Sequence, residues 1–324
     1  MARLAIVTSR VRVEEKLLFE ELDRRGIDYD IIDDGELLLD LAHRGRAAES
    51  RRPELGEAQE PAEGSRQTGE DLLPTAYRLL PAEARGYDAV LCRSVSQSRC
   101  LALMHVLESW GVLVFNSAAV TATCNDKLLT TLALLRAGIP TPRTLLAFAT
   151  QPAIEGIEIL GYPAVLKPVT GSWGRLLARI NDRDSAEAVL EHRETLGSYQ
   201  YHVHYMQEYI HKPQRDIRAF VVGDRTICAI YRASEHWVTN TARGAVAQNC
   251  PVTAELDSLC VRAARAVGGG ILAVDVLEDP ERGLLVNEIN ATMEFRNSIQ
   301  PTGVNIPREM IDYVLARVPE GALR

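Results

Sequence analysis

Three oxygen-bearing side chains near the carboxyl end of the chain could together hold a hard metal ion. Asp275 lies in the apolar run ILAVDVLE, Glu288 and Asn290 lie in the apolar run LLVNEIN, and the turn-forming cluster DPERG separates the runs. In a hairpin that pairs residue 279 with residue 284, Asp275 faces Glu288. Asn290 shares their face, because alternate strand residues point the same way. Two carboxylates and an amide oxygen suit Mg²⁺ carrying a nucleotide, and a solvated strand end is the alternative.

Two lysines lie where they could contact phosphate groups. Lys167 follows the apolar run YPAVL and precedes the loop GSWG at 171–174, so an ammonium and backbone N–H groups could surround phosphate oxygens. Lys127 opens an expected helix, whose amino end favours anions. The glycines at both ends make this loop the best candidate for a lid. Neither lysine belongs to a GxxxxGK[ST] sequence, which excludes a P-loop, and a surface lysine is the alternative for each.

Further polar residues could contact a nucleotide. Asp216 and Arg218 share one face of an expected strand, where the carboxylate could hold ribose hydroxyls and the guanidinium could reach a phosphate or carboxylate. Arg243 lies beside a glycine in the polar loop TNTARGA and could stabilise the charge of a transferring phosphoryl group. An exposed Asp/Arg pair and an ordinary turn arginine are the alternatives.

The first part of the chain alternates strand and helix signals, which predicts a small parallel sheet with helices on its faces. Residues 43–74 interrupt the alternation. They are charged, rich in Pro and Gly and almost free of β-branched residues, so we expect a mobile insertion there. Strands are expected at 4–9, 29–33, 87–93 and 112–116, and helices at 13–25 and 98–110.

Two further units are expected after this sheet. The second begins with a helix that Thr123 or Asn125 caps and that ends at Arg136, because Gly138 and Pro140 follow. The second unit also has expected strands at 162–169 and 177–182 and a helix at 185–196; the third has a strand at 201–210, a hairpin over 216–232 turned by Gly223-Asp224, and helices at 253–267 and 307–317.

Length and composition limit the class of protein. A chain of 324 residues is expected to form two or three domains, here 1–118, 119–204 and 205–324. A net charge of −8 argues against a nucleic-acid binder, so any anionic ligand must meet a local cluster of Arg and Lys. The six cysteines are scattered without a CxxC pair, and no apolar run reaches the ~20 residues of a membrane span. We therefore expect a soluble cytoplasmic protein with reduced thiols that binds neither nucleic acid nor membranes.

The chain resembles the ATP-grasp superfamily, and more narrowly the RimK-type carboxylate–amine ligases, in the order of its pieces: Lys127, VLKPVTGSWG, QEYI, DIR, TNTARGA, Asp275 and Glu288-x-Asn290. The resemblance covers the chain except the 43–74 insertion. It implies an α/β (α+β) ATP-grasp fold, in which a Rossmann-like parallel-sheet domain precedes two lobes that enclose ATP. The implied ATP contacts are Lys127, Lys167, Gly171, Ser172, Trp173, Gly174, Gln207, Glu208, Tyr209 and Ile210, with Asp216 at the ribose; the implied catalytic residues are Arg218, Asn240 and Arg243, and the implied ligands of two Mg²⁺ ions are Asp275, Glu288 and Asn290.

The residues after Asn290 indicate a subgroup. ATMEFRNS at 291–298, RSVSQSR at 93–99 and FNSAAVTATCNDK at 115–127 are similar to the LysX-type ligases, which join α-aminoadipate to the amino-group carrier protein LysW in lysine biosynthesis. The resemblance implies that ATP phosphorylates the γ-carboxylate of the carrier's C-terminal glutamate and that the amino acid's α-amine then displaces the phosphate. Glutamate, which sister enzymes of an arginine pathway use, stays open as the amino acid. The implied amino-acid pocket is bounded by Arg93, Thr292, Met293, Glu294, Phe295, Arg296 and Asn297, with Met293 and Phe295 in the core as the alternative.

Two other functions stay open. A RimK-like enzyme would add glutamate to the terminus of a protein or peptide on the same scaffold, and a regulatory protein would bind ATP without ligation. The full set of Asp275, Glu288, Asn290 and both lysines favours an enzyme, because a mere binder could lose them freely. The resemblance also implies a small acidic carrier protein as partner and a homo-oligomer, either a dimer or a tetramer.

Overall fold

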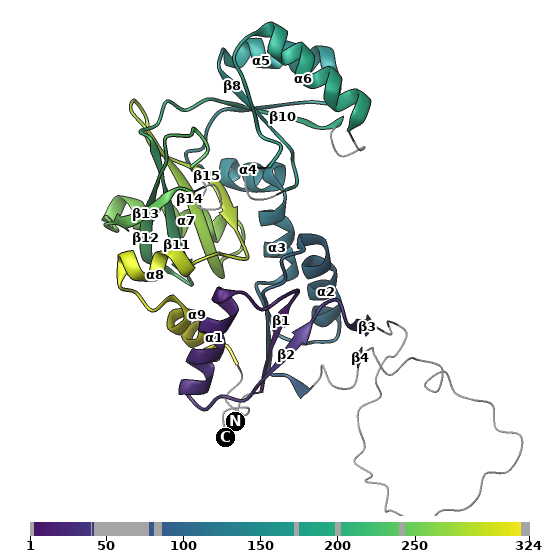
Figure 1. The fold of residues 1–324 in the computed structure, drawn as a ribbon, viewed down its shortest axis with the longest axis vertical. Coiled ribbons are helices and arrows are strands. Elements are labelled where there is room, and N and C mark those ends of the chain that lie inside the picture. Colours follow the sequence, from purple (N-terminus) through teal and green to yellow (C-terminus); the bar gives the residue numbers. More distant parts are fainter. Residues whose placement is uncertain are drawn as a thin grey trace, which may run out of the picture.

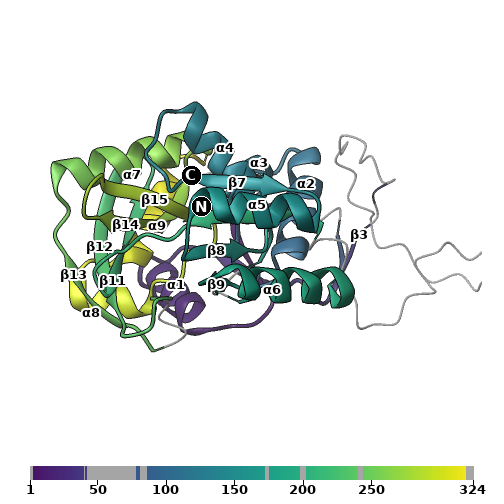
Figure 2. The same ribbon diagram turned by 90° about the horizontal axis from the view of Figure 1, so that it is seen from above.

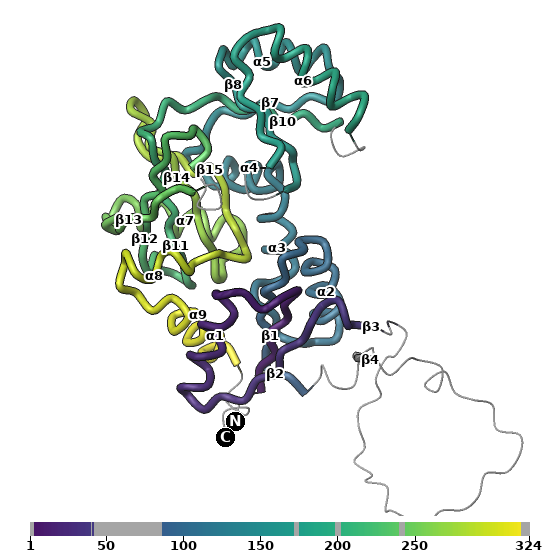
Figure 3. The backbone as a smooth tube through the Cα atoms, viewed as in Figure 1, coloured from purple at the N-terminus to yellow at the C-terminus, as the bar shows by residue number. Residues whose placement is uncertain are grey.

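The described part of the chain folds around three main sheets. The computed structural model describes residues 3–39, 41, 78–80, 86–171, 175–197, 202–239 and 244–318. Figure 1 shows the amino-terminal domain at one end, a small central lobe at the other, and the carboxyl-terminal lobe beside them. The tube in Figure 3 follows the chain from the amino-terminal domain to the central lobe through α3 (Ala118–Asn125) and α4 (Lys127–Arg136).

The amino-terminal domain contains a four-stranded parallel sheet, as the alternating sequence signals predict. Its strand order is β2-β1-β5-β6, and every residue of the two central strands is buried. Helix α2 begins where the Ser96 hydroxyl accepts a hydrogen bond from the Arg99 backbone N–H. The elements are β1 (Leu4–Thr8), α1 (Val13–Arg24), β2 (Tyr29–Asp33), β5 (Ala89–Cys92), α2 (Gln97–Ser109) and β6 (Val114–Phe115), beside a separate two-stranded pair of β3 (Leu37–Leu39) and β4 (Arg78–Leu80).

The central lobe is an antiparallel sheet of order β7-β10-β8-β9. Strand β10 pairs with both β7 and β8, so the strand that we expected to open the third unit lies in the second. The cap of α4 also differs from the prediction: Asp126, rather than Thr123 or Asn125, accepts the N–H of Leu129. Two elements that sequence signals did not indicate complete this lobe, β7 (Thr144–Ala147) and α5 (Thr150–Leu160), beside β8 (Ala164–Lys167), β9 (Ala178–Ile180), α6 (Arg183–Leu196) and β10 (His204–Glu208).

The carboxyl-terminal lobe is a five-stranded antiparallel sheet of order β13-β12-β11-β14-β15. Phe220 and Val222 pack on the side of α9, whereas Ala219 and Val221 pack on the side of α7, because alternate strand residues point to opposite faces. Figure 2 shows α7 and α8 on opposite sides of this sheet. The elements are β11 (Arg215–Val222), β12 (Arg225–Ala233), β13 (Val246–Cys250), α7 (Ala254–Ala266), β14 (Ile271–Asp279), β15 (Gly283–Asn290), α8 (Arg296–Thr302) and α9 (Ile306–Leu315).

Both hairpins of this lobe form where the sequence predicts them. Gly223-Asp224 turns β11 into β12, and the DPERG cluster turns β14 into β15. The register of the second hairpin differs near its turn, where Asp279 pairs with Gly283 rather than with the predicted Leu284.

The side-chain amide of Asn116 makes three of the hydrogen bonds that join the amino-terminal domain to the carboxyl-terminal lobe. The Asn116 side chain donates to the carbonyls of Ile271 and Ala291, at 2.8 and 2.7 Å, and accepts the N–H of Ile271 at 2.7 Å. A Cβ on Gly270 would lie 2.1 Å from the Asn116 amide oxygen, and φ there is +123°, so the position requires glycine. These hydrogen bonds of Asn116 hold the loops of the amino-terminal sheet next to the end of β15.

Candidate active site

The predicted metal ligands meet on the β14–β15 hairpin. Asp275 lies directly opposite Glu288, and both line, together with Asn290, a cavity of about 150 Å³. A β-bulge at Asn287 adds one residue to β15. The bulge compensates the shifted register near the turn and restores the predicted pairing of Asp275 with Glu288.

A buried row of alternating charges borders this cavity. Arg218 forms two hydrogen bonds to Asp275, at 2.8 and 2.9 Å, and Arg232 forms two to Asp216, both at 2.7 Å. Arg232 also lies 3.1 Å from Asp275. Burial alone would raise the pKa of Asp275, but Arg218 and Arg232 outweigh it and hold this pKa below its usual value. Sequence reasoning identified three members of the row and missed Arg232.

Lys167 connects the central lobe to the bulge. Its ammonium donates to the Gln207 side-chain oxygen at 2.5 Å and to the Asn287 side-chain oxygen at 2.9 Å. Burial, aided by the charge of Lys127 and opposed by Glu288, lowers the pKa of Lys167 to about 8. A buried ammonium beside the cavity is suited to an anionic ligand, as the sequence predicts for Lys167. Asn287 was not a candidate, because only the bulge turns it toward this lysine.

Lys127, the first residue of α4, contacts the first residue of the predicted lid loop. Its ammonium donates to the carbonyl of Gly171 at 2.8 Å. Several predicted residues lie outside the described part of the chain, and their roles stay predictions: Ser172, Trp173 and Gly174 of the loop, Asn240 and Arg243 of the phosphoryl-transfer site, and the whole 43–74 insertion.

The segment predicted to hold adenine, residues 207–210, includes the end of β10 and the two residues after it. The Glu208 carboxylate accepts hydrogen bonds from the Arg143 backbone N–H at 2.6 Å and from the Arg282 guanidinium at 2.8 Å. In this structure the carboxylate therefore bonds to other parts of the protein. Ile210 packs against apolar residues of β14 and β15, and Tyr209 lies beside it in the chain. No described residue of 207–210 lines the 150 Å³ cavity, so their contact with adenine stays a prediction.

The donor groups of the hairpin fit Mg²⁺. Glu288 forms no hydrogen bond with the described residues, and the buried Asn290 amide nitrogen has no partner among them. Asp275 keeps oxygen lone pairs beyond its bonds to Arg218 and Arg232. Within the described ranges no three His, Cys, Asp or Glu side chains form a metal cluster, so the set depends on the Asn290 amide oxygen. An all-oxygen set of this kind is what Mg²⁺ prefers.

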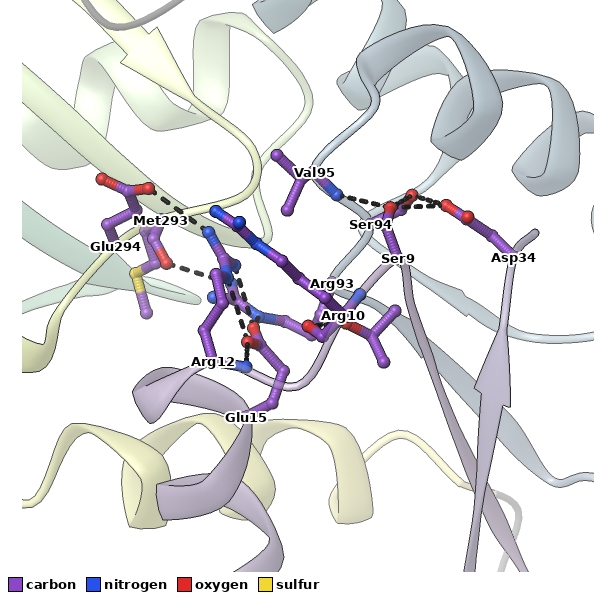
Figure 4. Close-up of polar contacts among 11 residues, drawn as sticks. Ser9, Arg10, Arg12, Glu15, Asp34, Arg93, Ser94, Val95, Met293 and Glu294 are labelled. Carbon is purple, nitrogen blue, oxygen red and sulfur yellow. Dashed lines mark hydrogen bonds and ion pairs between the residues drawn. The ribbon is translucent and has the colours of Figure 1, made fainter.

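A second cavity of about 290 Å³ adjoins the first and is rich in arginine. The two cavities share Arg12, Arg218, Arg232 and Glu294. Arg12 contacts Glu15 at 2.9 Å and Glu294 at 3.3 Å, as Figure 4 shows. Sequence reasoning named Arg93 from the amino-terminal domain but missed Arg10, Arg12 and Glu14, because only tertiary contacts bring them here. The other charged or amide lining residues are Arg10, Glu14, Arg296 and Asn297.

The segment after Asn290 divides between the cavities and the core. Thr292 and Glu294 line the first cavity. Met293 and Phe295 are 1% and 0% exposed and pack with α9, so the core alternative holds for these two rather than substrate contact. Neighbouring residues of an extended segment point to opposite sides, which explains the alternation.

Arg93 supports this segment from behind. It is 1% exposed and donates to Glu15 at 3.1 Å and to the Met293 carbonyl at 3.0 Å (Figure 4). Its guanidinium carbon lies 5.6 Å from the centre of the Phe295 ring. Burial lowers the pKa of Arg93 despite its bond to Glu15. Arg93 lines neither cavity and its described contacts support the backbone of this segment, so its contact with a substrate stays a prediction.

The amino-terminal domain also closes the first cavity. Ser94 and Val95 line it from the loop after β5, and Gln97 lines it from the start of α2. The hydroxyls of Ser9 and Ser94 both donate to the Asp34 carboxylate, the former at 2.7 Å, and Figure 4 shows this cluster beside Val95. The loop is therefore held by the carboxyl ends of three parallel strands.

A Rossmann-like domain followed by two lobes, with lysines on one lobe and a carboxylate hairpin on the other, is the architecture of an ATP-grasp ligase. The chain belongs to the RimK-like ATP-grasp family: the family model of the RimK-like ATP-grasp domain matches residues 124–314. The model of the LysX preATP-grasp domain matches residues 4–52 and 75–123. The unmatched interval between them falls within the 43–74 insertion.

Relatives cover most of the chain. It is 39% identical over 226 residues to the alpha-aminoadipate–LysW ligase LysX of Saccharolobus solfataricus, covering 69% of this chain and 82% of that protein. It is 32% identical over 314 residues to the glutamate–LysW ligase ArgX of Sulfurisphaera tokodaii, covering 96% and 98%. The crystal structure of a RimK domain ATP-grasp protein from Sphaerobacter thermophilus superimposes with a TM-score of 0.71 at 26% identity, over 97% of this chain and 100% of that chain.

The chain is therefore an ATP-grasp ligase, and such ligases bind ATP and Mg²⁺. All six cysteines lie in the described ranges and are buried free thiols, as predicted. Among the residues that the structure describes, no helix is both long and apolar enough to cross a membrane.

Proposed function

We propose that this ligase joins α-aminoadipate to the C-terminal glutamate of a LysW-like amino-group carrier protein, using ATP and Mg²⁺. The observation that carries the proposal is the pair of adjoining cavities. One holds the carboxylate hairpin, the other is rich in arginine, and Arg218 and Arg232 line both. A cavity for the nucleotide beside a cavity for an anion is suited to the transfer of a phosphoryl group from ATP to a carboxylate. The LysX and ArgX relatives, named as LysW ligases, support the carrier and the acidic amino acid.

The reaction has two displacement steps. An oxygen of the carrier's γ-carboxylate attacks the γ-phosphorus of ATP, and the bond to ADP breaks to leave an acyl phosphate. The neutral α-amine of the amino acid then attacks the acyl carbon, phosphate leaves, and the extra proton of the amine passes to solvent. Mg²⁺, when bound by Asp275, Glu288 and Asn290, neutralises charge on the phosphate oxygens. Arg218, which reaches both cavities, stabilises the transferring group, and Lys167 holds the nucleotide phosphates.

The test is ADP release by the purified enzyme with Mg²⁺, a LysW-like carrier and either α-aminoadipate or glutamate. We expect ADP and a carrier whose mass grows by one amino-acid residue, with the larger kcat/KM for α-aminoadipate. A carrier with its C-terminal Glu replaced by Gln is the matched control and should give no ADP. ADP release without a carrier, or no product with either acid, would contradict the proposal. A larger kcat/KM for glutamate would keep the carrier reaction and reassign the acid to arginine biosynthesis.

Three finer features belong to the same proposal. Asp275, Glu288 and Asn290 would hold two Mg²⁺ ions, which would supply charge neutralisation to the phosphate oxygens and to the attacking carboxylate. The enzyme forms a dimer or tetramer, which sedimentation equilibrium measures directly. It acts in the cytoplasm, where fractionation of cells that produce it would find it.

A further inference from the structure

The central lobe has an apolar groove of about 520 Å³ that the two reaction steps do not use. It lies between β9 and the carboxyl-terminal half of α6, which Figure 2 shows side by side. Ala178 and Val189 line it and pack against the core of this lobe. Leu176 and Leu196 also line it and are 61% and 73% exposed. Large apolar side chains exposed around one groove are typical of a surface that another chain covers.

Leu176 has a strained backbone at this groove. Its φ of +59° is the only left-handed value of a non-glycine residue in the described part of the chain. The buried Arg193 holds this conformation by donating a hydrogen bond to the Leu176 carbonyl at 2.9 Å. The strain exposes an apolar side chain and gains no burial for it within the lobe, so it indicates a contact with another molecule.

The groove continues into the first cavity at Leu177. Leu177 lines both, and among the described residues of β7 to β10 it is the only one that lines the 150 Å³ cavity. A ligand that reacts in this cavity can therefore leave the rest of its chain in the groove. The C-terminal glutamate of a protein has such a chain, because each preceding residue of an extended segment spans roughly 3.3–3.6 Å. A free amino acid has none.

The charges of the groove favour an acidic chain. Its titratable lining residues are His192 and Arg193, and no carboxylate of the described residues lines it, because the glutamates of α6 lie outside this lining. An acidic segment therefore meets no like charge on the groove itself. A second copy of this ligase fits less well, because a permanent interface there would close the path past Leu177.

We propose that the carrier protein docks in this groove through the segment that precedes its C-terminal glutamate. The proposal rests on the proposed function and adds the docking surface for its protein partner. The segment lies extended along α6 with an apolar side chain on Ala178 and Val189. It then passes Leu177, and the glutamate enters the first cavity. The central lobe therefore recognises the carrier as well as the nucleotide.

The first test places a negative charge in the groove. Leu196→Asp should raise the KM for the carrier roughly tenfold, because it removes an apolar contact and repels an acidic segment, and should leave the KM for ATP within about twofold. Ile159→Asp is the matched control, because Ile159 is an exposed residue of α5 in the same lobe and does not line the groove. Equal carrier KM values for the two variants would overturn the proposal.

The second test locates the partner on the groove. All six cysteines of the chain are buried, so Leu196→Cys introduces an exposed thiol that can carry a photo-activated cross-linker. In the presence of ATP and Mg²⁺ this variant should cross-link to the C-terminal segment of the carrier, which peptide mass analysis identifies. Ile159→Cys with the same label should not. A cross-link to a second ligase chain, or equal cross-linking from both positions, would refute carrier docking in the groove.

The third test distinguishes failure of the groove from failure of the proposed function. Hydroxylamine traps an acyl phosphate as a hydroxamate, so wild-type enzyme with ATP, Mg²⁺ and carrier should form a carrier hydroxamate without any amino acid. If it forms none, the proposed function fails. If it forms the hydroxamate, and Leu196→Asp reaches its half-maximal rate at the same carrier concentration as Ile159→Asp, the docking proposal fails alone and the ligase function stands.

Discussion

The side-chain oxygen of Asn287 accepts a 2.9 Å hydrogen bond from the ammonium of Lys167, joining the hairpin of the carboxyl-terminal lobe to the central lobe. Asn287 is the extra residue of a β-bulge, and Lys167 is buried with Gln207 as its other acceptor. The bond therefore holds, from the carboxyl-terminal lobe, the ammonium of the lysine that we propose contacts the nucleotide phosphates. β-Bulges beside active sites commonly re-aim a side chain in this way.

Asn287→Ala should weaken nucleotide binding roughly tenfold, because the buried ammonium loses one of two acceptors and its position with it. Titration of a fluorescent ATP analogue measures the dissociation constant. Asn249→Ala, an exposed asparagine on β13, is the matched control. Equal affinity of the two variants would show that the cross-lobe bond does not position Lys167.

Nucleotide affinity should fall as the pH rises through about 8, the pKa of Lys167 in the ligand-free protein. Phosphate oxygens favour the protonated ammonium, so the pKa rises on binding, and affinity is highest below about 8 and lost above it. Binding should therefore take up a proton at pH 8.5. Calorimetry in two buffers of different ionisation enthalpy measures this uptake. Lys167→Met should bind weakly with no step in this range, and a step that persists in the variant would assign the titration to another group.

Glu288→Gln should abolish Mg²⁺-dependent turnover while shifting the melting temperature little. The change keeps the size of the side chain and removes one of two anionic donors, and Glu288 holds no hydrogen bond in the described structure. The rate of ADP release, measured over a range of Mg²⁺ concentrations and in EDTA as the metal-free limit, tests this prediction. Glu281→Gln in the exposed turn of the same hairpin is the control. Undiminished turnover in Glu288→Gln would remove this residue from the metal site.

Arg232→Leu should lower the free energy of unfolding by about 3–5 kcal/mol, because it leaves the buried Asp216 without its partner and Asp275 with only one. Arg265→Leu removes an arginine from an exposed ion pair with Asp224 and should cost less than about 1 kcal/mol. Urea denaturation of both variants measures the difference. Similar losses would mean that the buried row of charges contributes no more than a surface pair.

Much of the site could be predicted from local sequence. Asp275, Glu288 and Asn290 come together because a two-residue side-chain period and a turn cluster are local properties. Lys167 and Arg218 could be predicted for the same reason, because each was identified from its own strand and the residues next to it in the chain. The predicted strands of the amino-terminal sheet also formed, because alternating strand and helix signals specify a parallel sheet.

Residues on separate elements could not be predicted in the same way. Strand β10 was expected in the third unit, yet it pairs with β7 and β8. The sequence of a strand does not specify which other strands it pairs with. Arg232 pairs with Asp216 only because an irregularity between Phe220 and Val221 shifts the β11–β12 register by one residue.

The sequence by itself therefore determined the family, the carboxylate hairpin and the lysine strand, all of which depend on residues close together in the chain. Tertiary structure decided the bulge that aims Asn287, the burial of Arg93, and the approach of Arg10, Arg12 and Glu14 to the segment after Asn290. The physical reason is that these contacts depend on domain packing, which side-chain period and turn signals do not encode.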